Sequence, residues 1–394
     1  MGIIKVGFKH QYQSNTRAIL SINTLLSGLF CLYVLVGWIA YIQAANGLPI
    51  IRYFPIIIGL SVFIIETINL SRRYQFAYQL TGVLLLGLLL SALVNNTPFL
   101  VGSANLLSHT GIALFLLRRP LEGFVFPFTY LLFLFVVAYF TYYFYNGIDP
   151  NEIFLYASRN VVSWLLIVYS AIIYIVSDKA RLKIPVLPAV MTVIFSVMSY
   201  GRSGIISSFI LLMGILLLTF RENRKNSKFY ILLTFLGILS MFFLSNGGDI
   251  GNTIYDISHY FHRLETQGLS DSAGREYIWN TYINQMDMTR FLFGTNAKYD
   301  SSVITFDYNY HNSFMNFHAS FGIVSIIFMF LMLWAMVKLF NRNNLLLLIL
   351  ITVILRSFTD DLVFVSQPYD FIVYYITMYA FICDHHKNTT VTKH

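Results

Sequence analysis

Length, composition and charge exclude a soluble globular protein. The chain has 394 residues, of which 57% are hydrophobic and only 11% are charged, whereas a soluble domain carries about 25% charged residues. The net charge of +8 indicates no nucleic-acid partner, because the basic residues stand in short loops between apolar stretches. The two cysteines, Cys31 and Cys383, fall within such stretches and offer neither a disulfide framework nor a metal-ligand spacing.

Stretches of about 20 apolar residues recur along the chain, and each is long enough to cross the roughly 30 Å hydrocarbon core of a bilayer. The first is too long for the apolar part of a signal peptide and has no small-residue cleavage site after it, so we expect an uncleaved span. In chain order the predicted spans are 18–43, 50–70, 76–95, 98–117, 123–145, 155–177, 184–200, 204–220, 229–246, 312–340, 344–359 and 368–384. They predict an all-α polytopic membrane protein with about twelve transmembrane helices.

Basic residues assign the two sides of the membrane, because they favour cytoplasmic loops. With the N-terminus in the cytoplasm, the cytoplasmic loops hold 18 of the 26 Lys and Arg residues. No other assignment of the loops to the two sides of the membrane separates basic from acidic residues as well. Both termini are then cytoplasmic. The chain divides into nine spans in 1–246, a large periplasmic loop at 247–311 and C-terminal spans in 312–394. Segment 184–220 suits two tight crossings or a re-entrant hairpin, and its polar tip, 199–204, points outward either way.

The loop 247–311 differs in composition from the spans. Apolar and aromatic residues recur at helical spacing in two places, namely Ile257, Tyr260, Phe261 and Leu264, and then Ile278, Trp279, Tyr282 and Met286. Each pattern predicts a short amphipathic helix on the membrane surface or under a lid. Ordinary packing explains these stripes as well as substrate contact does.

Arg202 stands at the outer tip of an otherwise apolar hairpin. A basic side chain at membrane depth costs about 2.5–3.5 kcal/mol and tends to mark a functional or paired position. A lipid-headgroup anchor is the alternative, since arginine reaches the headgroups from near the interface. Gly201 and Gly204 permit a tight turn and the close approach of a ligand. Ser203 opens the next helix, whose N-terminus suits an anion.

Arg275 follows Gly274 at the start of the second predicted loop helix. Two arginines at helix starts on one face suggest a diphosphate site, because the planar guanidinium binds phosphate oxygens with two hydrogen bonds. The alternative for Arg275 is an ion pair with Asp271 or Glu276.

His311 lies where the long loop enters the next span, and Asn312 follows it. A neutral imidazole can take up a proton near pH 7, although a lone histidine is more often a structural one. Asn312 could hold a sugar hydroxyl or the tautomer of His311. His318 lies two helical turns further on, as a supporting or a packing residue.

Two weaker clusters complete the candidates. Asp360 and Asp361 stand near Arg356 and predict an ion-pair cluster rather than acid–base machinery. His259 and His262, with Asp256 one turn earlier, could offer three metal ligands, but no established metal motif is present. We therefore predict no metal site.

Four segments, in this order, resemble elements of the bacterial O-antigen polymerase and ligase superfamily, which holds Wzy-type polymerases and WaaL-type ligases. They are Arg202-Ser203-Gly204, Gly274-Arg275-Glu276-Tyr277-Ile278-Trp279, Phe293-Gly294-Thr295-Asn296 and His311-Asn312-Ser313-Phe314. Met315 replaces the leucine usual after the last of them, and Tyr200-Gly201 precede the arginine where a small polar residue is commoner. The resemblance covers roughly 199–322; earlier spans add only their hydrophobic profile.

This resemblance implies a GT-C type glycosyltransferase of the bacterial inner membrane that uses undecaprenyl-diphosphate-linked oligosaccharides without a cofactor or metal. In this interpretation His311 is the base, and Arg202 and Arg275 hold the diphosphate. Further substrate contacts are expected from Ser203, Gly204, Trp279, Arg290, Asn312 and Arg356. Besides membrane lipids, a chain-length regulator is a candidate partner.

Richness in Ile, Phe, Tyr and Asn favours an O-antigen polymerase over an O-antigen ligase or a capsule polymerase. A lipid-linked oligosaccharide flippase is the rival from another class, and a structural or receptor role is a further alternative. A flippase should show two related halves and polar residues along a mid-membrane path. The sequence shows no repeat, and its outer charges gather at one face.

Overall fold

The computed structural model describes residues 12–68, 71–222, 273–361, 363–364 and 367–382. Every regular element among them is a helix, and eight of these helices are long and apolar enough to cross a membrane. The eight are α1 (Tyr12–Ala45), α2 (Tyr53–Thr67) taken together with the 3-10 turn before it, α3 (Gln75–Asn95), α4 (Phe99–Arg118), α5 (Val125–Tyr145), α6 (Asn160–Lys179), α8 (Arg202–Glu222) and α14 (Ile323–Phe340). Three shorter apolar helices join them, α7 (Leu187–Met198), α15 (Asn344–Ser357) and α16 (Phe371–Ile382). The protein therefore has the helical, multi-pass architecture that its hydropathy predicts.

The predicted spans within the described ranges correspond to helices, whereas the predicted span 229–246 lies outside them. One prediction needs correction, because the single span expected at 312–340 is two helices, α13 (Ser313–Phe321) and α14. Gly322 between them has a φ of +57°, a left-handed conformation that ends a helix. The segment that follows His311 therefore forms a short helix of its own.

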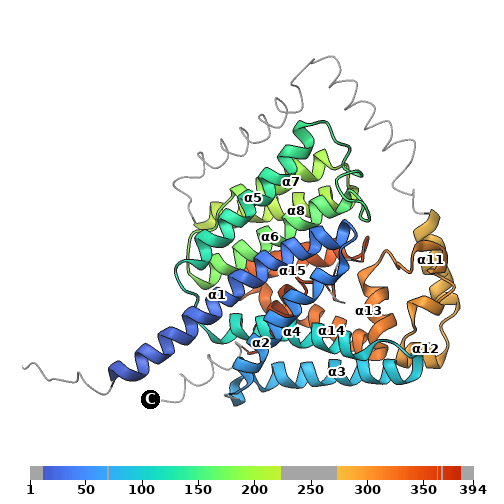
Figure 1. Ribbon diagram of the computed structural model, residues 1–394, viewed down its shortest axis with the longest axis horizontal. Helices are drawn as coiled ribbons and strands as arrows, with labels where there is room; N and C mark the ends of the chain where they lie inside the picture. The colour runs from blue at the N-terminus through green and yellow to red at the C-terminus, as the bar shows by residue number, and fades with distance from the viewer. Residues whose placement is uncertain (1–11, 69–70, 223–272, 362, 365–366, 383–394) are drawn as a thin grey trace, which may run out of the picture.

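Helix α6 occupies the middle of the bundle (Figure 1) and packs against α5, α7, α8 and α15. Every side chain from Val161 to Ser177 is buried, including the large rings of Trp164, Tyr169 and Tyr174. A helix that is apolar all round is expected to be enclosed by other helices. Because α6 is held on all sides, it supports the residues that lie at its two ends.

Helices α2 and α4 approach each other through small residues. A Cβ atom added to Gly59 would lie 1.9 Å from Ser108 Oγ, and one added to Gly111 would lie 2.5 Å from the Gly59 carbonyl oxygen. Small residues allow such close contact of two membrane helices, which gains packing and backbone contacts. This pair forms one wall of the half of the bundle that also contains α3 and α16.

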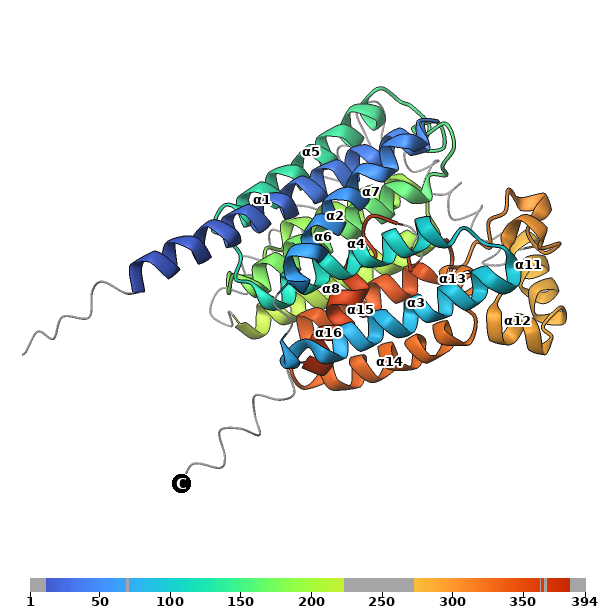
Figure 2. The same cartoon turned by 60° about the horizontal axis from the view of Figure 1, so that its bottom comes forward.

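Successive helices alternate in direction, so their connections lie at two opposite ends of the bundle. The end that carries α11 (Ala273–Asn284), α12 (Met288–Phe293) and α13 is here called the loop end (Figure 2). Buried Glu66 lies at the opposite end, 2.9 Å from nitrogens of both Arg118 and Arg119. Further basic residues on the turns of this end are Arg72, Arg73, Arg181, Lys183, Arg221 and Arg342. It is called the basic end below.

Short 3-10 helices occur in the connections. They are η1 (Pro49–Arg52), η2 (Arg72–Tyr74), η3 (Ala297–Tyr299) and η4 (Ile304–Phe306). At the loop end, the connection after α5 is tied to α1, because the Tyr156 amide donates to the Ala45 carbonyl oxygen at 2.8 Å. The turns of the loop end are thus joined to one another as well as to their own helices.

Candidate functional site

The loop helices α11 and α12 enclose a small core of their own. Its buried members are Ile278, Tyr282, Val303, Tyr310 and Ala319. The second predicted loop helix is thus observed as α11, with its apolar stripe turned inward, and Trp279 packs half-buried against this core. The first predicted loop helix, at 257–264, and the histidines considered as metal ligands lie outside the described residues.

Arg290 is engaged within the loop. Its guanidinium pairs with Asp300 and lies 4.1 Å from the ring centre of Tyr282. The Tyr310 hydroxyl donates to the same carboxylate at 2.8 Å, and only 11% of the Arg290 side chain is exposed. Arg290, expected from the sequence to contact substrate, therefore holds the loop together in this structure.

Two glycines let the loop contact α13 backbone to backbone. A Cβ atom on Gly294, whose φ is +76°, would lie 2.1 Å from the carbonyl oxygen of Ala319. One on Gly322 would lie 2.1 Å from that of Leu292. No side chain fits at either place, so the Phe293-Gly294 motif has a clear structural task. Asn296 extends the attachment to α3 by donating to the carbonyl oxygens of residues 95 and 96.

His318 is a packing residue at this junction. Its Nδ1 lies 2.7 Å from the Tyr282 hydroxyl, and its Nε2 lies 3.2 Å from the carbonyl oxygen of Phe291. Both ring nitrogens are therefore engaged by the loop, and the packing interpretation of His318 is the one that fits the structure.

The segment from His311 to Ser313 is attached to the connection between α15 and α16. Asn312 caps α13, since its Oδ1 accepts from two backbone amides of the first turn at 2.9 and 3.2 Å. Its Nδ2 donates to the Phe358 carbonyl oxygen at 3.2 Å, and Ser313 Oγ donates to that of Asp360 at 2.7 Å. The amide of Asn312 is thus used to place α13 against this connection.

Asp360 joins two arginines that come from different parts of the chain. Its Oδ2 lies 2.6 Å from Arg356 Nη1, and its Oδ1 lies 3.7 Å from Arg275 Nη2. Arg356 is fully buried, whereas 35% of the Arg275 side chain is exposed. The carboxylate beside Arg275 comes from the α15–α16 connection, whereas Asp271, one of the two partners considered in the alternative interpretation, lies outside the described residues. The ion pair predicted for Arg356 is confirmed with Asp360, whereas Asp361 bonds to the Asn316 amide instead.

Arg202 begins α8 directly after a tight turn that packs on the start of α6. A Cβ atom on Gly201 would lie 2.9 Å from Asn160 Oδ1, and one on Gly204 would lie 2.2 Å from Ser163 Oγ. Both glycines are therefore required by the close contact between α8 and α6, independently of any ligand.

The carbonyl group of Asn160 connects the parts of the site. It accepts a hydrogen bond from Arg356 Nη2 at 3.1 Å, while the side chain of Asn160 touches the turn before Arg202. A continuous path of contacts thus leads from the Arg202 turn, where Ser203 is the second residue of α8, through Arg356 and Asp360 to Arg275. Segments distant in the sequence meet at the loop end.

His311 stands next to this charged cluster. It has a φ of +50°, and its backbone amide donates to Asn309 Oδ1 at 2.7 Å. Burial lowers the pKa of His311 below its ordinary value of 6.5; the Asp360 carboxylate opposes this shift and the Arg275 guanidinium adds to it. The imidazole is therefore neutral at pH 7 and able to accept a proton.

Asp361 differs from its neighbour Asp360. Burial raises the pKa of Asp361 to about 7, against the effect of the Asn316 amide, which donates to its Oδ2 at 2.6 Å. The charge of Asp360 raises this pKa further. The two adjacent carboxyl groups thus have different surroundings: Asp360 is paired with arginines, whereas Asp361 has no basic partner among the described residues.

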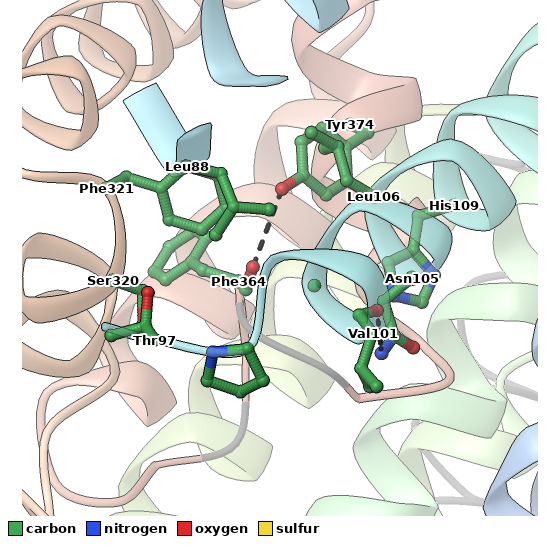
Figure 3. Close-up of a pocket in the computed structure, with 12 residues that line it drawn as sticks. Leu88, Thr97, Val101, Asn105, Leu106, His109, Ser320, Phe321, Phe364 and Tyr374 are labelled. Atoms are coloured by element: carbon green, nitrogen blue, oxygen red, sulfur yellow. Dashed lines mark hydrogen bonds between the residues drawn. The ribbon is translucent and has the colours of Figure 1, made fainter. Parts of the chain in front are cut away.

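A second candidate site, which the sequence analysis did not single out, is a cavity within the bundle next to buried polar side chains. A cavity of about 120 Å³ between α3, α4, α13 and α16 is lined by His109 and Asn105 on one side and by Phe321 on another (Figure 3). His109 Nδ1 lies 3.1 Å from the Tyr33 hydroxyl, and its Nε2 lies 3.6 Å from Asp370. Ionisable residues inside apolar spans are costly and tend to be functional, and this rule is the signal by which the sequence could have indicated His109.

Comparison with known families finds a match to part of the chain. A family model described as O-antigen ligase matches residues 187–331. The matched region belongs to the O-antigen polymerase and ligase superfamily.

The match to this O-antigen superfamily extends from α7 into α14 and includes all three residues predicted as catalytic, Arg202, Arg275 and His311. It ends before Arg356 and Asp360, so the connection that completes the cluster lies outside the matched region. A search of curated proteins found no match to the chain. Members of the family are glycosyltransferase-like membrane enzymes, which agrees with the helical, multi-pass architecture.

Proposed function

We propose that this protein is an O-antigen polymerase, which joins oligosaccharide repeat units carried on undecaprenyl diphosphate at the periplasmic face of the bacterial inner membrane. The observation that carries the proposal is the cluster at the loop end, where a neutral His311 stands beside Arg275. The positive-inside rule supports a cytoplasmic basic end and a periplasmic loop end. The family match supports transfer of O-antigen sugars.

The proposed reaction is a displacement at the anomeric carbon of the sugar bound to the lipid diphosphate. The hydroxyl oxygen of the acceptor forms the new glycosidic bond as the bond from that carbon to the diphosphate oxygen breaks. The electron pair of the broken bond leaves with undecaprenyl diphosphate, and the hydroxyl proton passes to His311. A positioned base contributes about 10²–10⁴-fold to such a step, and attack from the opposite face inverts the anomeric centre.

Arg275 and Arg202 are proposed to bind the diphosphate. Negative charge grows on the leaving group as the bond breaks, and prearranged guanidinium groups stabilise that charge. Arg275 is suited to this task because it is partly exposed and its 3.7 Å distance to Asp360 leaves it loosely paired. Arg356, by contrast, is fully buried, and we propose that it acts through Asp360 rather than on the substrate. The reaction as written uses no metal ion.

An O-antigen ligase is the second candidate, favoured by the description of the matching family model. The two enzymes share the same donor chemistry and differ in the acceptor, which is a second lipid-linked repeat unit for a polymerase and the lipid A core for a ligase. A lipid-linked oligosaccharide flippase is the third. His311, Arg202 and Arg275 would act on the donor in a polymerase or a ligase, whereas in a flippase they would have no catalytic role.

The experiment uses a strain that lacks the gene and is complemented with wild type, Arg275→Ala or Lys298→Ala. Lys298 is exposed on the same loop and serves as the matched loss of one positive charge. We expect a ladder of surface lipopolysaccharide with wild type and Lys298→Ala, and single repeat units on core with Arg275→Ala, at equal protein levels in the membrane.

Three other results of this experiment would contradict the proposal that the protein is a polymerase. Core without any repeat unit, while lipid-linked polymer accumulates, would indicate a ligase. Single lipid-linked units trapped on the cytoplasmic side would indicate a flippase. A normal ladder in Arg275→Ala would remove this arginine from the mechanism.

A further inference from the structure

A second concave site lies at the basic end of the bundle. A cavity of about 740 Å³ opens there between the α6–α7 turn, the last turn of α8 and the α14–α15 turn. A water molecule takes up about 30 Å³ in the liquid, so the cavity has room for a phospholipid headgroup with its glycerol. Its lining residues are Asp178, Arg181, Leu182, Lys183, Ile184, Leu218, Arg221, Arg342, Asn343, Asn344 and Leu345.

Four basic side chains from three separate turns converge on this cavity. Arg181 and Lys183 come from the α6–α7 turn, Arg221 from α8 and Arg342 from the α14–α15 turn. Basic residues at this end are expected from the topology alone, but that rule only places them in loops. It does not require four of them to face one hollow between three helices.

Among the described residues that line the cavity, Asp178 is the single carboxylate, and it is bonded to a neutral neighbour. Both of its oxygens accept from Asn343 Nδ2, at 3.1 and 3.0 Å. Asn343 in turn caps α15 through its Oδ1, which accepts from the Leu346 amide at 3.0 Å. Among the described lining residues, basic groups therefore outnumber carboxylates by four to one.

The start of α15 adds to this positive field. Asn344 and Leu345, the first residues of the helix, both line the cavity. The first amides of a helix lack acceptors within the helix, and its dipole is positive at this end. Backbone amides and basic side chains together are the groups that bind phosphate oxygens.

We propose that this cavity binds the phosphate of an anionic phospholipid headgroup, such as that of phosphatidylglycerol. Basic pockets between membrane helices on the cytoplasmic side recognise such headgroups. Helices α6, α8 and α15 each reach from this cavity to the cluster at the loop end, roughly 30 Å away for the 20 residues of α6. A lipid bound here fixes the far ends of the three helices that position Asn160, Arg202 and Arg356. The proposal does not depend on the reaction proposed above.

The test measures lipid binding to the purified full-length protein in detergent by native mass spectrometry, with phosphatidylglycerol as the probe and phosphatidylcholine as the zwitterionic reference. The variant is Arg181→Gln with Lys183→Gln, two exposed residues of one turn. The matched control is Arg72→Gln with Arg73→Gln, also two exposed residues of the basic end, but outside the cavity.

We expect wild type and the control to retain one tightly bound phosphatidylglycerol and the cavity variant to bind it roughly 30-fold more weakly, since each basic residue contributes about 1 kcal/mol. Phosphatidylcholine should show no such tight site. Equal binding by the cavity variant, or an equal loss in the control, would overturn the proposal. Displacement of the lipid by millimolar inorganic phosphate would overturn the lipid assignment and indicate a site for free phosphate.

Discussion

Replacement of Asp360 by asparagine should destabilise the protein strongly, because Asp360 carries the charge that balances buried Arg356. Removing one partner of a buried ion pair costs about 3–5 kcal/mol. Arg356 would keep two neutral acceptors, the Thr359 hydroxyl at 2.9 Å and the Asn160 carbonyl oxygen at 3.1 Å. Asp360 is itself 12% exposed in its side chain. We therefore expect the lower end of that range, about 3 kcal/mol.

The matched control is Asp361→Asn. The pKa of Asp361 is raised to about 7, so near neutral pH this carboxyl carries only part of its charge. Its replacement by a neutral amide should therefore not destabilise the protein. The assay is the melting temperature of the detergent-solubilised protein at pH 7, and a loss of about 3 kcal/mol corresponds to a fall of several degrees.

Two results would contradict this prediction. Asp360→Asn could have the same melting temperature as the wild type, or the melting temperatures of both variants could fall by the same amount. In the first case the buried guanidinium does not need the carboxylate. In the second case a neutral amide at position 361 costs as much as one at position 360, so the loss does not come from the charge opposite Arg356.

Three further predictions follow from the same contacts. Because the charge of Arg275 helps to lower the pKa of His311, Arg275→Ala should raise that pKa. Carbethoxylation of His311, measured by mass spectrometry, should then require a higher pH. An unchanged pH profile would show that the charge of Arg275 does not act on His311. Gly294→Ala forces a Cβ atom to 2.1 Å from a carbonyl oxygen and should lower the melting temperature by several degrees, whereas Gly123→Ala, with nothing within 4 Å, should not. In Gly204→Ala the new Cβ atom would lie 2.2 Å from Ser163 Oγ. The polymer ladder should therefore decrease by more than the amount of the protein in the membrane does. A full ladder would show that close packing at Gly204 is not needed.

The pH dependence of stability offers a test of Asp361. The pKa of this carboxyl is raised in the folded protein, so the folded state binds more protons than the unfolded state between about pH 4 and 7. Stability is therefore expected to fall as the pH rises through this window. Melting temperatures of wild type and Asp361→Asn, measured across the window, should converge at its acid end and differ most above pH 7. Parallel curves would contradict the raised pKa.

The sequence was sufficient for those features that depend on local composition. Apolar stretches of about 20 residues predicted the helices because membrane helices must satisfy their backbone hydrogen bonds internally. The helical spacing of Ile278 and Tyr282 predicted a buried stripe, which α11 has. The break at Gly322 was missed, because an apolar stretch continues through it and only the backbone contact with Leu292 shows why the helix ends.

The partners of the site residues could not be read from the sequence. The alternative considered for Arg275 was a pair with Asp271 or Glu276, its neighbours along the chain, but the carboxylate observed beside it is Asp360, from the α15–α16 connection. That pairing depends on how the connection folds against α13. Asn312 raised the same difficulty, since its motif suggests a ligand contact while its amide caps a helix.

The most direct test of the proposed chemistry is the release of undecaprenyl diphosphate by purified protein supplied with lipid-linked repeat units, comparing wild type with His311→Gln. We expect the variant to bind the donor with the same Kd as wild type, while its turnover falls about 10²–10⁴-fold, the contribution of a positioned base. Turnover of His311→Gln within a few-fold of wild type would contradict the assignment of His311 as the group that accepts the proton.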